Sequence, residues 1–483
     1  MSRSVLFTLL TAFALSVAVR WPLIDRPLSA HHEYCTAFTL IALTNWWEDG
    51  FFTHHGLPSG GFIRDGEALF PSAHYDRNER AVGLYYFSHP PLAYDVPYAL
   101  FSLTNTAPNV PGLQWMNMFF HLLTAWAFFV VLRVVLDEGG ALFGAVLYLF
   151  LPVTLWFHGN AYMSDMFVQV PWMFHLVFAI RLFQNDGTAS RKIWVGYSAT
   201  LFLTVYTSWL GVFAAVAGVM VATIRWWRGT RPRLMSLILL TGLALLAACG
   251  LTAWRFLQVI DTAALFQHFA TRFAVRGSVG VDLWPTLTQV LVNYRIGFLP
   301  LIVLLIVLFV RNRVGKGNMP TFPEKLGLFV LITGLPVLLD HLVLLQYAEH
   351  DFAALKAAPL LCGLAGWALT TLRPVWSRAA LGLTCVVCVL YFYRTNPWPG
   401  HDNGRYEQER TIGTFIAAHA AADEVVFGHG IATEPQVSWY ARRNVLGVAY
   451  PDAAIAILKE RGLPRAVVFA MDNGVLSATH IAR

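Results

Sequence analysis

Charged residues are scarce in this sequence, and their scarcity limits the kinds of protein that it can encode. Asp, Glu, Lys and Arg make up 13% of the 483 residues, and hydrophobic residues make up 57%, whereas ordinary water-soluble domains are about 25% charged. This composition excludes a water-soluble fold. A bilayer core about 30 Å thick needs about 20 apolar residues per spanning helix, and runs such as residues 234–251 and 326–345 supply them. Most of the chain is therefore predicted to lie in lipid.

Paired cysteines and a nucleotide-binding glycine pattern are also missing. The cysteines number five, and four of them lie inside apolar runs: Cys249, Cys362, Cys385 and Cys388. We interpret them as small buried hydrophobic residues. Gly428-His429-Gly430 resembles a phosphate loop only weakly. The net charge of +6 comes from Arg and Lys at the ends of apolar runs, where anionic headgroups attract them, so no nucleic-acid partner is expected.

Eleven apolar runs are predicted to span the membrane: residues 5–22, 114–132, 140–157, 166–184, 193–207, 210–226, 234–252, 297–311, 326–345, 354–372 and 378–393. We interpret the first as an uncleaved helix. If Met1 is cytoplasmic, every basic short loop falls on the cytoplasmic side, as the positive-inside rule requires. These loops contain Arg133, Arg181, Arg191, Lys192, Arg225, Arg228, Arg231, Arg233, Arg311, Arg313, Lys316, Lys325, Arg373 and Arg378. The predicted fold is an all-α polytopic protein of the inner (plasma) membrane.

This topology places a long first loop (residues 23–113), a short loop around residues 158–165, a medium loop (253–296) and the C-terminal tail on the extracytoplasmic, periplasmic side. Within the first loop, residues 34–47 and 92–103 are predicted to form helices at the membrane surface. The tail alternates helical stretches (408–421 and 453–461) with β-branched runs (425–427 and 466–469), a pattern typical of a small α/β domain. We therefore divide the chain into a transmembrane domain (1–393) and a C-terminal α/β domain (394–483).

Candidate functional residues gather in the predicted outer segments. Glu33 follows the first helix and is interpreted either as a base for an attacking hydroxyl or as a cap of the helix after it. His89 precedes two prolines, which restrict its backbone and hold its side chain in a set direction. The alternative to a functional role is a simple turn at the membrane surface. Asp165 begins an apolar helix, where a structural role at the helix N-terminus is the alternative, but its position on the same side of the membrane as Glu33 favours a function. His350 and Lys356 lie near an outer turn, where they are candidates to bind a phosphate or a metal, and a polar turn exposed to water is the alternative.

A reaction in which a lipid phosphate is the leaving group needs cationic side chains, because negative charge builds on the phosphate as it leaves. The medium loop supplies Arg255, Arg272, Arg276 and Arg295, and the residues alone do not choose among them. For any single arginine, lying along the lipid surface is the alternative. Our candidate substrate- or phosphate-binding residues are His32, Tyr86, His89, Arg255, Arg276, His350 and Lys356. A divalent metal stays an open alternative, with His89 and His350 as its candidate ligands.

The order of these motifs resembles the membrane glycosyltransferases of the GT-C fold, in the branch of glycosyltransferase family 39 with protein O-mannosyltransferases and bacterial aminoarabinose transferases. The matching motifs are His32-Glu33-Tyr34, Gly50-Phe51-Phe52, Pro90-Pro91-Leu92, Asp165 and a hairpin tip at residues 204–210. They cover about the first 230 residues, and the remainder matches by topology. In the family the first motif is an Asp-Glu pair, and this chain has His32-Glu33. Where relatives often have Glu-Lys before Pro-Pro-Leu, it has Ser88-His89.

The resemblance implies an inverting enzyme that moves a sugar from a polyprenyl-phosphate carrier to an acceptor hydroxyl of a glycan, lipid or protein. It implies that Glu33 is the catalytic carboxylate, which Asp165 would assist. No nucleotide sugar is expected. The alternative is a transporter or flippase of a lipid-linked glycan, which would favour charges at mid-membrane and internal symmetry. The glycosyltransferase interpretation requires that Glu33, His89, Asp165 and His350 share one cavity.

Overall fold

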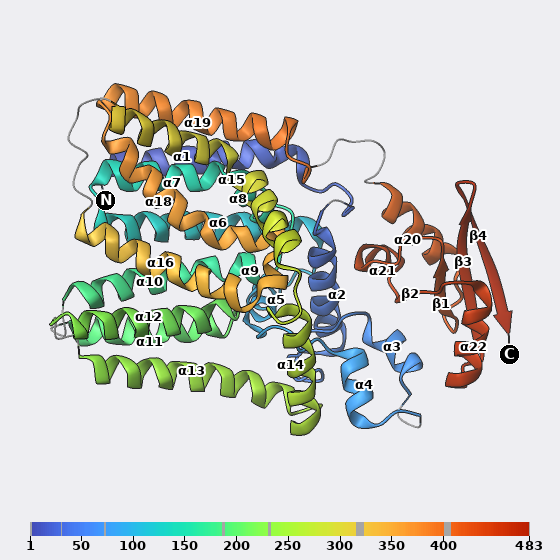
Figure 1. Ribbon diagram of the computed structural model, residues 1–483. Helices are drawn as coiled ribbons and strands as arrows, with labels where there is room; N and C mark the ends of the chain where they lie inside the picture. Colours follow the sequence, from blue (N-terminus) through green and yellow to red (C-terminus); the bar gives the residue numbers. More distant parts are fainter. Residues whose placement is uncertain are drawn as a thin grey trace.

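The protein is described here from a computed structural model that covers residues 2–29, 31–71, 74–185, 189–229, 233–314, 323–399 and 407–482. Two of the basic loop residues, Arg231 and Lys316, lie outside these ranges. Long helices run side by side and form the body of the molecule (Figure 1). They are α1 (Arg3–Arg20), α6 (Val110–Val135), α7 (Glu138–Phe150), α8 (Pro152–Phe157), α10 (Gln169–Gln184), α11 (Arg191–Val205), α12 (Leu210–Trp227), α13 (Leu234–Phe256), α15 (Leu283–Val314), α16 (Glu324–Val343), α18 (Ala358–Thr370) and α19 (Pro374–Arg394).

Among the described residues, nine helical segments are long and apolar enough to cross a membrane. This confirms the polytopic all-α class. The predicted spans 140–157 and 193–207 correspond to shorter helices. The first is divided into α7 and α8 because Pro152 has no N–H to continue α7, and the second is α11, with 15 residues. The predicted number of eleven spans therefore stays a prediction.

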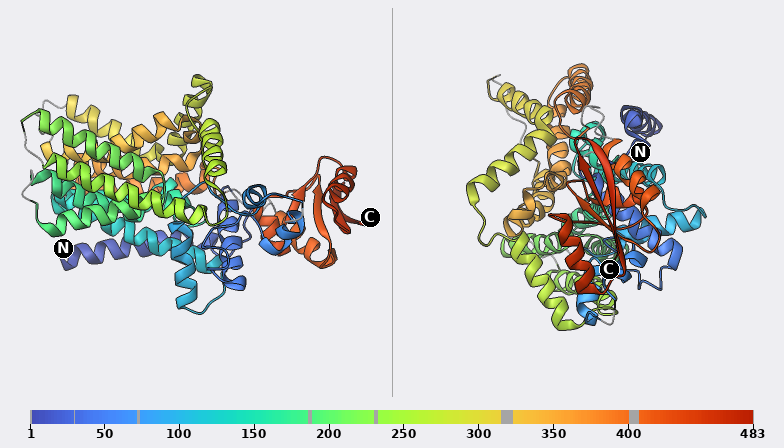
Figure 2. Two further views of the ribbon diagram at one scale, coloured as in Figure 1. Left: turned by 90° about the horizontal axis from the view of Figure 1, so that it is seen from below. Right: turned by 90° about the vertical axis from the view of Figure 1, so that its right-hand side faces the viewer.

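Shorter elements gather at one end of the bundle, opposite the N-terminus (Figures 1 and 2). They are η1 (Trp21–Leu23), α2 (Glu33–Asp49), α3 (Ile63–Leu69), α4 (Arg77–Leu84), α5 (Leu92–Leu103), α9 (Ser164–Phe167), α14 (Thr262–Arg276), α17 (Leu345–Ala348) and η2 (Asp351–Ala357). The helices predicted at 34–47 and 92–103 are confirmed as α2 and α5. The segments that the topology places outside thus share one end of the molecule.

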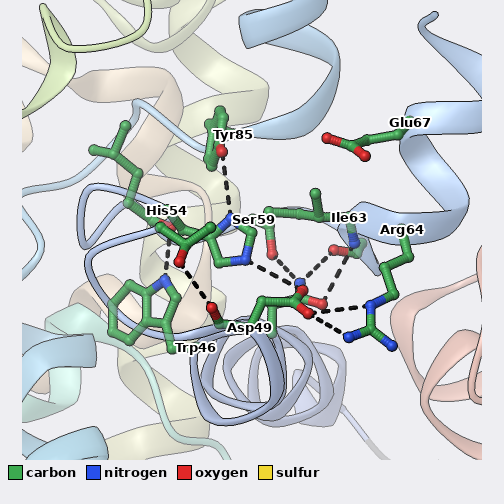
Figure 3. A network of polar contacts seen from close by, with 12 residues as sticks. Trp46, Asp49, His54, Ser59, Ile63, Arg64, Glu67 and Tyr85 are labelled. Atoms are coloured by element: carbon green, nitrogen blue, oxygen red, sulfur yellow. Dashed lines mark hydrogen bonds and ion pairs between the residues drawn. The ribbon is translucent and has the colours of Figure 1, made fainter.

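A network of polar contacts fastens the first loop to the end of α2 (Figure 3). Oδ1 of Asp49 accepts a hydrogen bond of 2.6 Å from Nη2 of Arg64, and Oδ2 lies 3.3 Å from Nε2 of His54. The indole N–H of Trp46 donates to the carbonyl of Leu57 at 3.0 Å. Because these contacts satisfy polar groups within the loop, the loop packs on α2 as a folded unit.

The C-terminal segment contains one four-stranded sheet in the order β2-β1-β3-β4. Its elements are α20 (Gln408–His419), β1 (Val425–His429), α21 (Pro435–Ala441), β2 (Val445–Gly447), α22 (Pro451–Arg461), β3 (Arg465–Asp472) and β4 (Val475–Ala482). β1 is parallel to β2 and β3, and β4 is antiparallel to β3. Alternate strand residues face α20 and α21 on one side and α22 on the other. The predicted helices and strands are all present, and α21, β2 and β4 are additional.

The sheet docks on the first loop through Asn444. Its Oδ1 accepts a hydrogen bond of 2.7 Å from the N–H of Phe62, and its Nδ2 donates to the carbonyl of Phe62 at 2.8 Å. A Cβ at Gly61 would lie 2.3 Å from Oδ1 of Asn444, so glycine is needed for this close approach. The hydroxyl of Tyr440 accepts a hydrogen bond of 2.8 Å from the N–H of Leu28, and this contact joins α21 to the segment after α1.

Candidate active site

Two cavities meet at this end of the bundle. One has a volume of about 210 Å³ and the other about 480 Å³. Four residues line both cavities: His89, Asp165, Arg276 and Tyr347. They come from four separate parts of the chain, namely the segment before α5, α9, the end of α14 and α17. The junction of the two cavities therefore has a carboxylate, a guanidinium, an imidazole and a phenol from four distant segments of the chain.

The walls of the two cavities differ in character. The smaller cavity is lined by hydroxyl-bearing aromatic and polar side chains, among them Tyr34, Tyr86, Tyr94, Tyr162, Ser164 and His350. The larger cavity is lined mainly by apolar side chains of α12, α14 and the end of α16, among them Trp209, Val212, Phe213, Phe269, Phe273, Val343 and Leu344. A ligand that fills both would have a polar head and an apolar tail, with its charge at the junction.

The carboxylate of Asp165 is buried at the junction. Its Oδ2 accepts a hydrogen bond of 2.7 Å from the hydroxyl of Tyr347, and its Oδ1 lies 3.3 Å from Nζ of Lys356. Nζ of Lys356 also donates to both oxygens of Asp340 at 3.0 and 2.8 Å. Among the described residues, Oδ1 of Asp165 has no hydrogen-bond partner. Oδ1 of this fixed, buried carboxylate thus has the ion pair with Lys356 but no hydrogen-bond donor, and a carboxylate oxygen of this kind can accept a proton.

Arg276 brings positive charge to the same junction. Its guanidinium lies 5.1 Å from the ring centre of Tyr347, and it forms no ion pair with any carboxylate in the described part of the chain. Burial lowers the pKa of Arg276, but the neighbouring Tyr347 and Tyr86 raise it by more, so that its pKa lies above the usual value. Arg272, one turn earlier in α14, lines the larger cavity. Guanidinium groups that lie beside a cavity and have no carboxylate partner are suited to hold a phosphate.

His89 is buried and neutral at physiological pH. Burial lowers its pKa to about 4, although Asp165 acts in the opposite direction. Its Nδ1 has no partner among the described residues. The hairpin tip holds the segment around His89, because the indole N–H of Trp209 donates to the carbonyl of Ser88 at 2.8 Å and the N–H of Leu92 donates to the carbonyl of Tyr206. His89 can therefore contact a ligand as a neutral imidazole.

Glu33, which the family resemblance singles out, does not line either cavity. Its Oε1 lies 2.7 Å from Nη2 of Arg26, its Oε2 accepts a hydrogen bond of 2.9 Å from the N–H of Ser29, and Asn160 donates to Oε1 at 3.2 Å. Both oxygens thus have donors, and the side chain is fully buried. The predicted set of four residues in one cavity is met by His89, Asp165 and His350 only. Glu33 instead anchors the segment that leads into α9.

Two predicted phosphate-binding cations already have anionic partners. Arg255 donates to both oxygens of Asp95 at 2.7 and 3.1 Å and to the hydroxyl of Tyr206 at 2.8 Å, and it does not line either cavity. Lys356 lines the larger cavity, but its ammonium group is engaged by Asp340 and Asp165. Tyr86 and Arg276, by contrast, line the smaller cavity as predicted ligand-binding residues would.

Metal-ligating side chains come together at a different place from the predicted one. Within the described ranges, His31, His32 and Asp351 form a group that could hold a metal ion, whereas His89 and His350 belong to no such group. His32 therefore faces Asp351, with Nε2 and Oδ1 2.8 Å apart, and lines neither cavity. Burial lowers the pKa of His32, although Asp351 raises it in part.

Two residues that contact Asp165 or its partner Lys356 were not predicted from the sequence, namely Tyr347 at the junction and Asp340 in the larger cavity. Tyr347 stands beside the candidate His350, but a tyrosine at a helix end is common at membrane surfaces. Asp340 offered a clearer signal, because it lies inside the predicted span 326–345, where an ionisable side chain is costly and usually functional.

No protein-family model and no curated protein matches the sequence, but solved structures do match the fold. ArnT from Cupriavidus metallidurans bound to undecaprenyl phosphate aligns with a TM-score of 0.65 at 14% identity, over 96% of this chain and 93% of that one. The oligosaccharyltransferase AglB from Archaeoglobus fulgidus, in complex with an inhibitory peptide and a dolichol-phosphate, aligns with a TM-score of 0.55 at 12% identity, over 97% and 69%. The chain has the GT-C fold. The GT-C prediction is thereby confirmed across nearly the whole chain, and membership of glycosyltransferase family 39 stays a prediction.

Proposed function

We propose that this GT-C protein transfers a sugar from a polyprenyl-phosphate carrier to an acceptor hydroxyl, with inversion of the anomeric centre. The observation that carries the proposal is the junction where a polar cavity and an apolar cavity share His89, Asp165, Arg276 and Tyr347. The prenyl tail would lie in the apolar cavity between α12, α14 and α16, the phosphate at the junction, and the sugar among the tyrosines of the smaller cavity.

The charges at the junction suit a phosphodiester. Three cationic side chains, Lys356, Arg272 and Arg276, face two carboxylates, Asp165 and Asp340, around the larger cavity. This leaves one net positive charge for a ligand that carries one negative charge. As the bond between the anomeric carbon and the phosphate oxygen breaks, its electron pair goes to the phosphate. Arg276 and Arg272 are placed to stabilise that added charge.

The proposed base is Asp165. It takes the proton of the acceptor hydroxyl while the hydroxyl oxygen attacks the anomeric carbon, and the polyprenyl phosphate leaves from the opposite face. A single displacement of this kind inverts the anomeric centre. Tyr347 and Lys356 orient the carboxylate, and Asp340 holds Lys356. We propose that Glu33 is a positioning residue, which acts on the segment before Asp165 through Asn160.

The structural relatives support the carrier class, because one is bound to undecaprenyl phosphate and another to a dolichol-phosphate with a peptide. We propose the same class of lipid carrier for this chain, and a glycan, lipid or protein as the acceptor. The reaction would take place on the extracytoplasmic face of the plasma membrane, where the positive-inside rule puts this end of the bundle.

The test is a transfer assay in proteoliposomes with a panel of polyprenyl-phosphate-linked pentoses, hexoses and amino sugars. Release of free polyprenyl phosphate together with a glycosylated acceptor is expected for at least one donor, and the Asp165→Asn variant should lose it. A flippase would move the donor across the bilayer without releasing polyprenyl phosphate. Translocation without release would therefore overturn the proposal in favour of that alternative.

A further inference from the structure

Three side chains with metal-ligating atoms converge beside the smaller cavity, although two of them lie more than 300 residues from the third. Nε2 of His31 lies 2.6 Å from Oδ2 of Asp351, and Nε2 of His32 lies 2.8 Å from Oδ1. The ligand atoms of the three residues all lie within 4.8 Å of one another. We propose that His31, His32 and Asp351 bind one Zn²⁺ ion, which joins the start of α2 to η2.

The surroundings hold these ligands in a fixed direction. His32 has φ 58° and ψ 7°, a left-handed conformation that is unfavourable for a residue with a Cβ. Its Nδ1 lies 3.1 Å from the hydroxyl of Tyr34, which leaves Nε2 toward Asp351. The indole N–H of Trp398 donates to Oδ2 of Asp351. Metal centres typically have such hydrogen-bond partners, which fix the orientation of a ligating ring or carboxylate.

The ligand chemistry and the exposure both suit zinc. Two imidazoles and one carboxylate are ligand types that Zn²⁺ prefers, with water in the fourth position. The side chain of His31 is 44% exposed, whereas those of His32 and Asp351 are 7% and 8% exposed. An ion can therefore reach the group from the surface at His31 and bind against the two buried ligands.

A bound ion would set the shape of the smaller cavity. Tyr34 follows two of the ligands at the start of α2, and Phe352 follows Asp351 in η2, and both line that cavity. The ion would fix the separation of these two walls. This role is structural, so it goes beyond the proposed transfer reaction and does not depend on it.

The test is the zinc content of the full chain, purified without a polyhistidine tag, incubated with Zn²⁺ alone and freed of excess by gel filtration. About one Zn²⁺ per chain is expected for the wild type, and close to none for His31→Ala and Asp351→Ala. His55→Ala, which removes an exposed histidine elsewhere in the first loop, should retain the ion. Because His31 is partly exposed, its replacement leaves the core filled, and loss of zinc in that variant would not reflect misfolding.

A spectroscopic variant tests the same ligand directly. His31→Cys loaded with Co²⁺ should show a thiolate-to-metal charge-transfer band in the near ultraviolet, which wild type with Co²⁺ should lack. Zinc binding that is equal in wild type and His31→Ala would overturn the proposal, as would a wild-type chain that retains no zinc. Either result would mean that the two histidines serve only as hydrogen-bond partners of Asp351.

Discussion

The hydroxyl of Tyr347 donates a hydrogen bond of 2.7 Å to Oδ2 of Asp165, and this contact joins α17 to α9 across the junction of the two cavities. Lys356 approaches the other carboxylate oxygen at 3.3 Å and is itself held by Asp340. The carboxylate is thereby fixed in position, and apart from the ion pair with Lys356, Oδ1 has no partner among the described residues. In the reaction that we propose, a base fixed in this way needs little reorganisation when an acceptor hydroxyl arrives.

Replacing Asp165 by asparagine should abolish transfer without unfolding the protein. The amide oxygen can still accept from Tyr347, and Lys356 keeps both hydrogen bonds to Asp340, so only the ion pair between Lys356 and Asp165 is lost. Removal of a general base typically costs a factor of about 100 to 10,000 in rate. We expect kcat to fall by at least about 100-fold, measured as polyprenyl phosphate release. Glu67→Gln, an exposed carboxylate of the first loop, is the control and should retain its rate. An active Asp165→Asn variant would exclude Asp165 as the base.

Arg276→Ala should weaken binding of the carrier phosphate. Hydrogen bonds to charged groups contribute about 1.5–3 kcal/mol, which corresponds to roughly 10- to 100-fold in affinity. The expected readout is a higher Kd for polyprenyl phosphate, measured by thermal shift or calorimetry in detergent. Arg276→Lys should recover part of the loss, because it restores the charge but not the planar donor pair. Equal affinity in Arg276→Ala and wild type would remove the guanidinium from the phosphate site.

Filling the apolar cavity should exclude the prenyl tail. Val212 lines this cavity from α12, and Val212→Trp would occupy its volume while the side chain stays apolar. We expect the KM for long-chain donors to rise at least about tenfold, with a smaller effect on donors that have one or two prenyl units. Val216→Trp, at an exposed position of the same helix, is the matched control. A KM that does not depend on chain length would place the tail elsewhere.

Glu33→Gln should act first on stability. The change removes the charge from a buried ion pair and leaves Arg26, whose side chain is 11% exposed, without its carboxylate. We expect a loss of about 1–3 kcal/mol in the free energy of unfolding, seen as a lower melting temperature. The opposite pattern, with unchanged melting and lost transfer, would return Glu33 to the role of catalytic carboxylate that the family resemblance implies.

The buried His89 predicts a loss of stability in acid. Its pKa is near 4 in the folded protein because burial disfavours the charged ring, whereas an exposed histidine titrates near about 6.5. Between these values the unfolded chain binds more protons, so the stabilising contribution is complete above about pH 6.5 and is lost as the pH falls toward 4. The melting temperature should therefore drop between pH 7 and pH 4.5, and less so in His89→Gln. If the melting temperature fell by the same amount in both proteins, protonation of His89 would not be the cause of the loss.

Much of this arrangement could be predicted from the sequence because hydropathy and loop charge report directly on membrane topology. Asp165, His89 and His350 were expected at one end of the bundle for that reason, and the same reasoning gave the α/β tail. The ion pairs between distant segments were less predictable. Arg255 pairs with Asp95, which lies 160 residues away in the sequence. The residues around Arg255 do not indicate this partner, and those around Asp95 do not indicate Arg255.

The position of Glu33 shows what a motif alone does not determine. The motif is present, but the pattern His32-Glu33 keeps only its second acidic residue, and that residue turns toward Arg26 and Asn160. Which way a side chain points depends on the backbone around it, here a left-handed His32 at the start of α2. Neither hydropathy nor residue spacing encodes that direction.

The most direct test of the central claim is a cryo-electron microscopy structure of the chain in lipid nanodiscs with polyprenyl phosphate. The predicted result is a phosphate within hydrogen-bonding distance of Arg276 and beside Asp165, with the prenyl tail between α12, α14 and α16. A phosphate bound at the opposite end of the bundle, or a tail that leaves the larger cavity empty, would contradict the account.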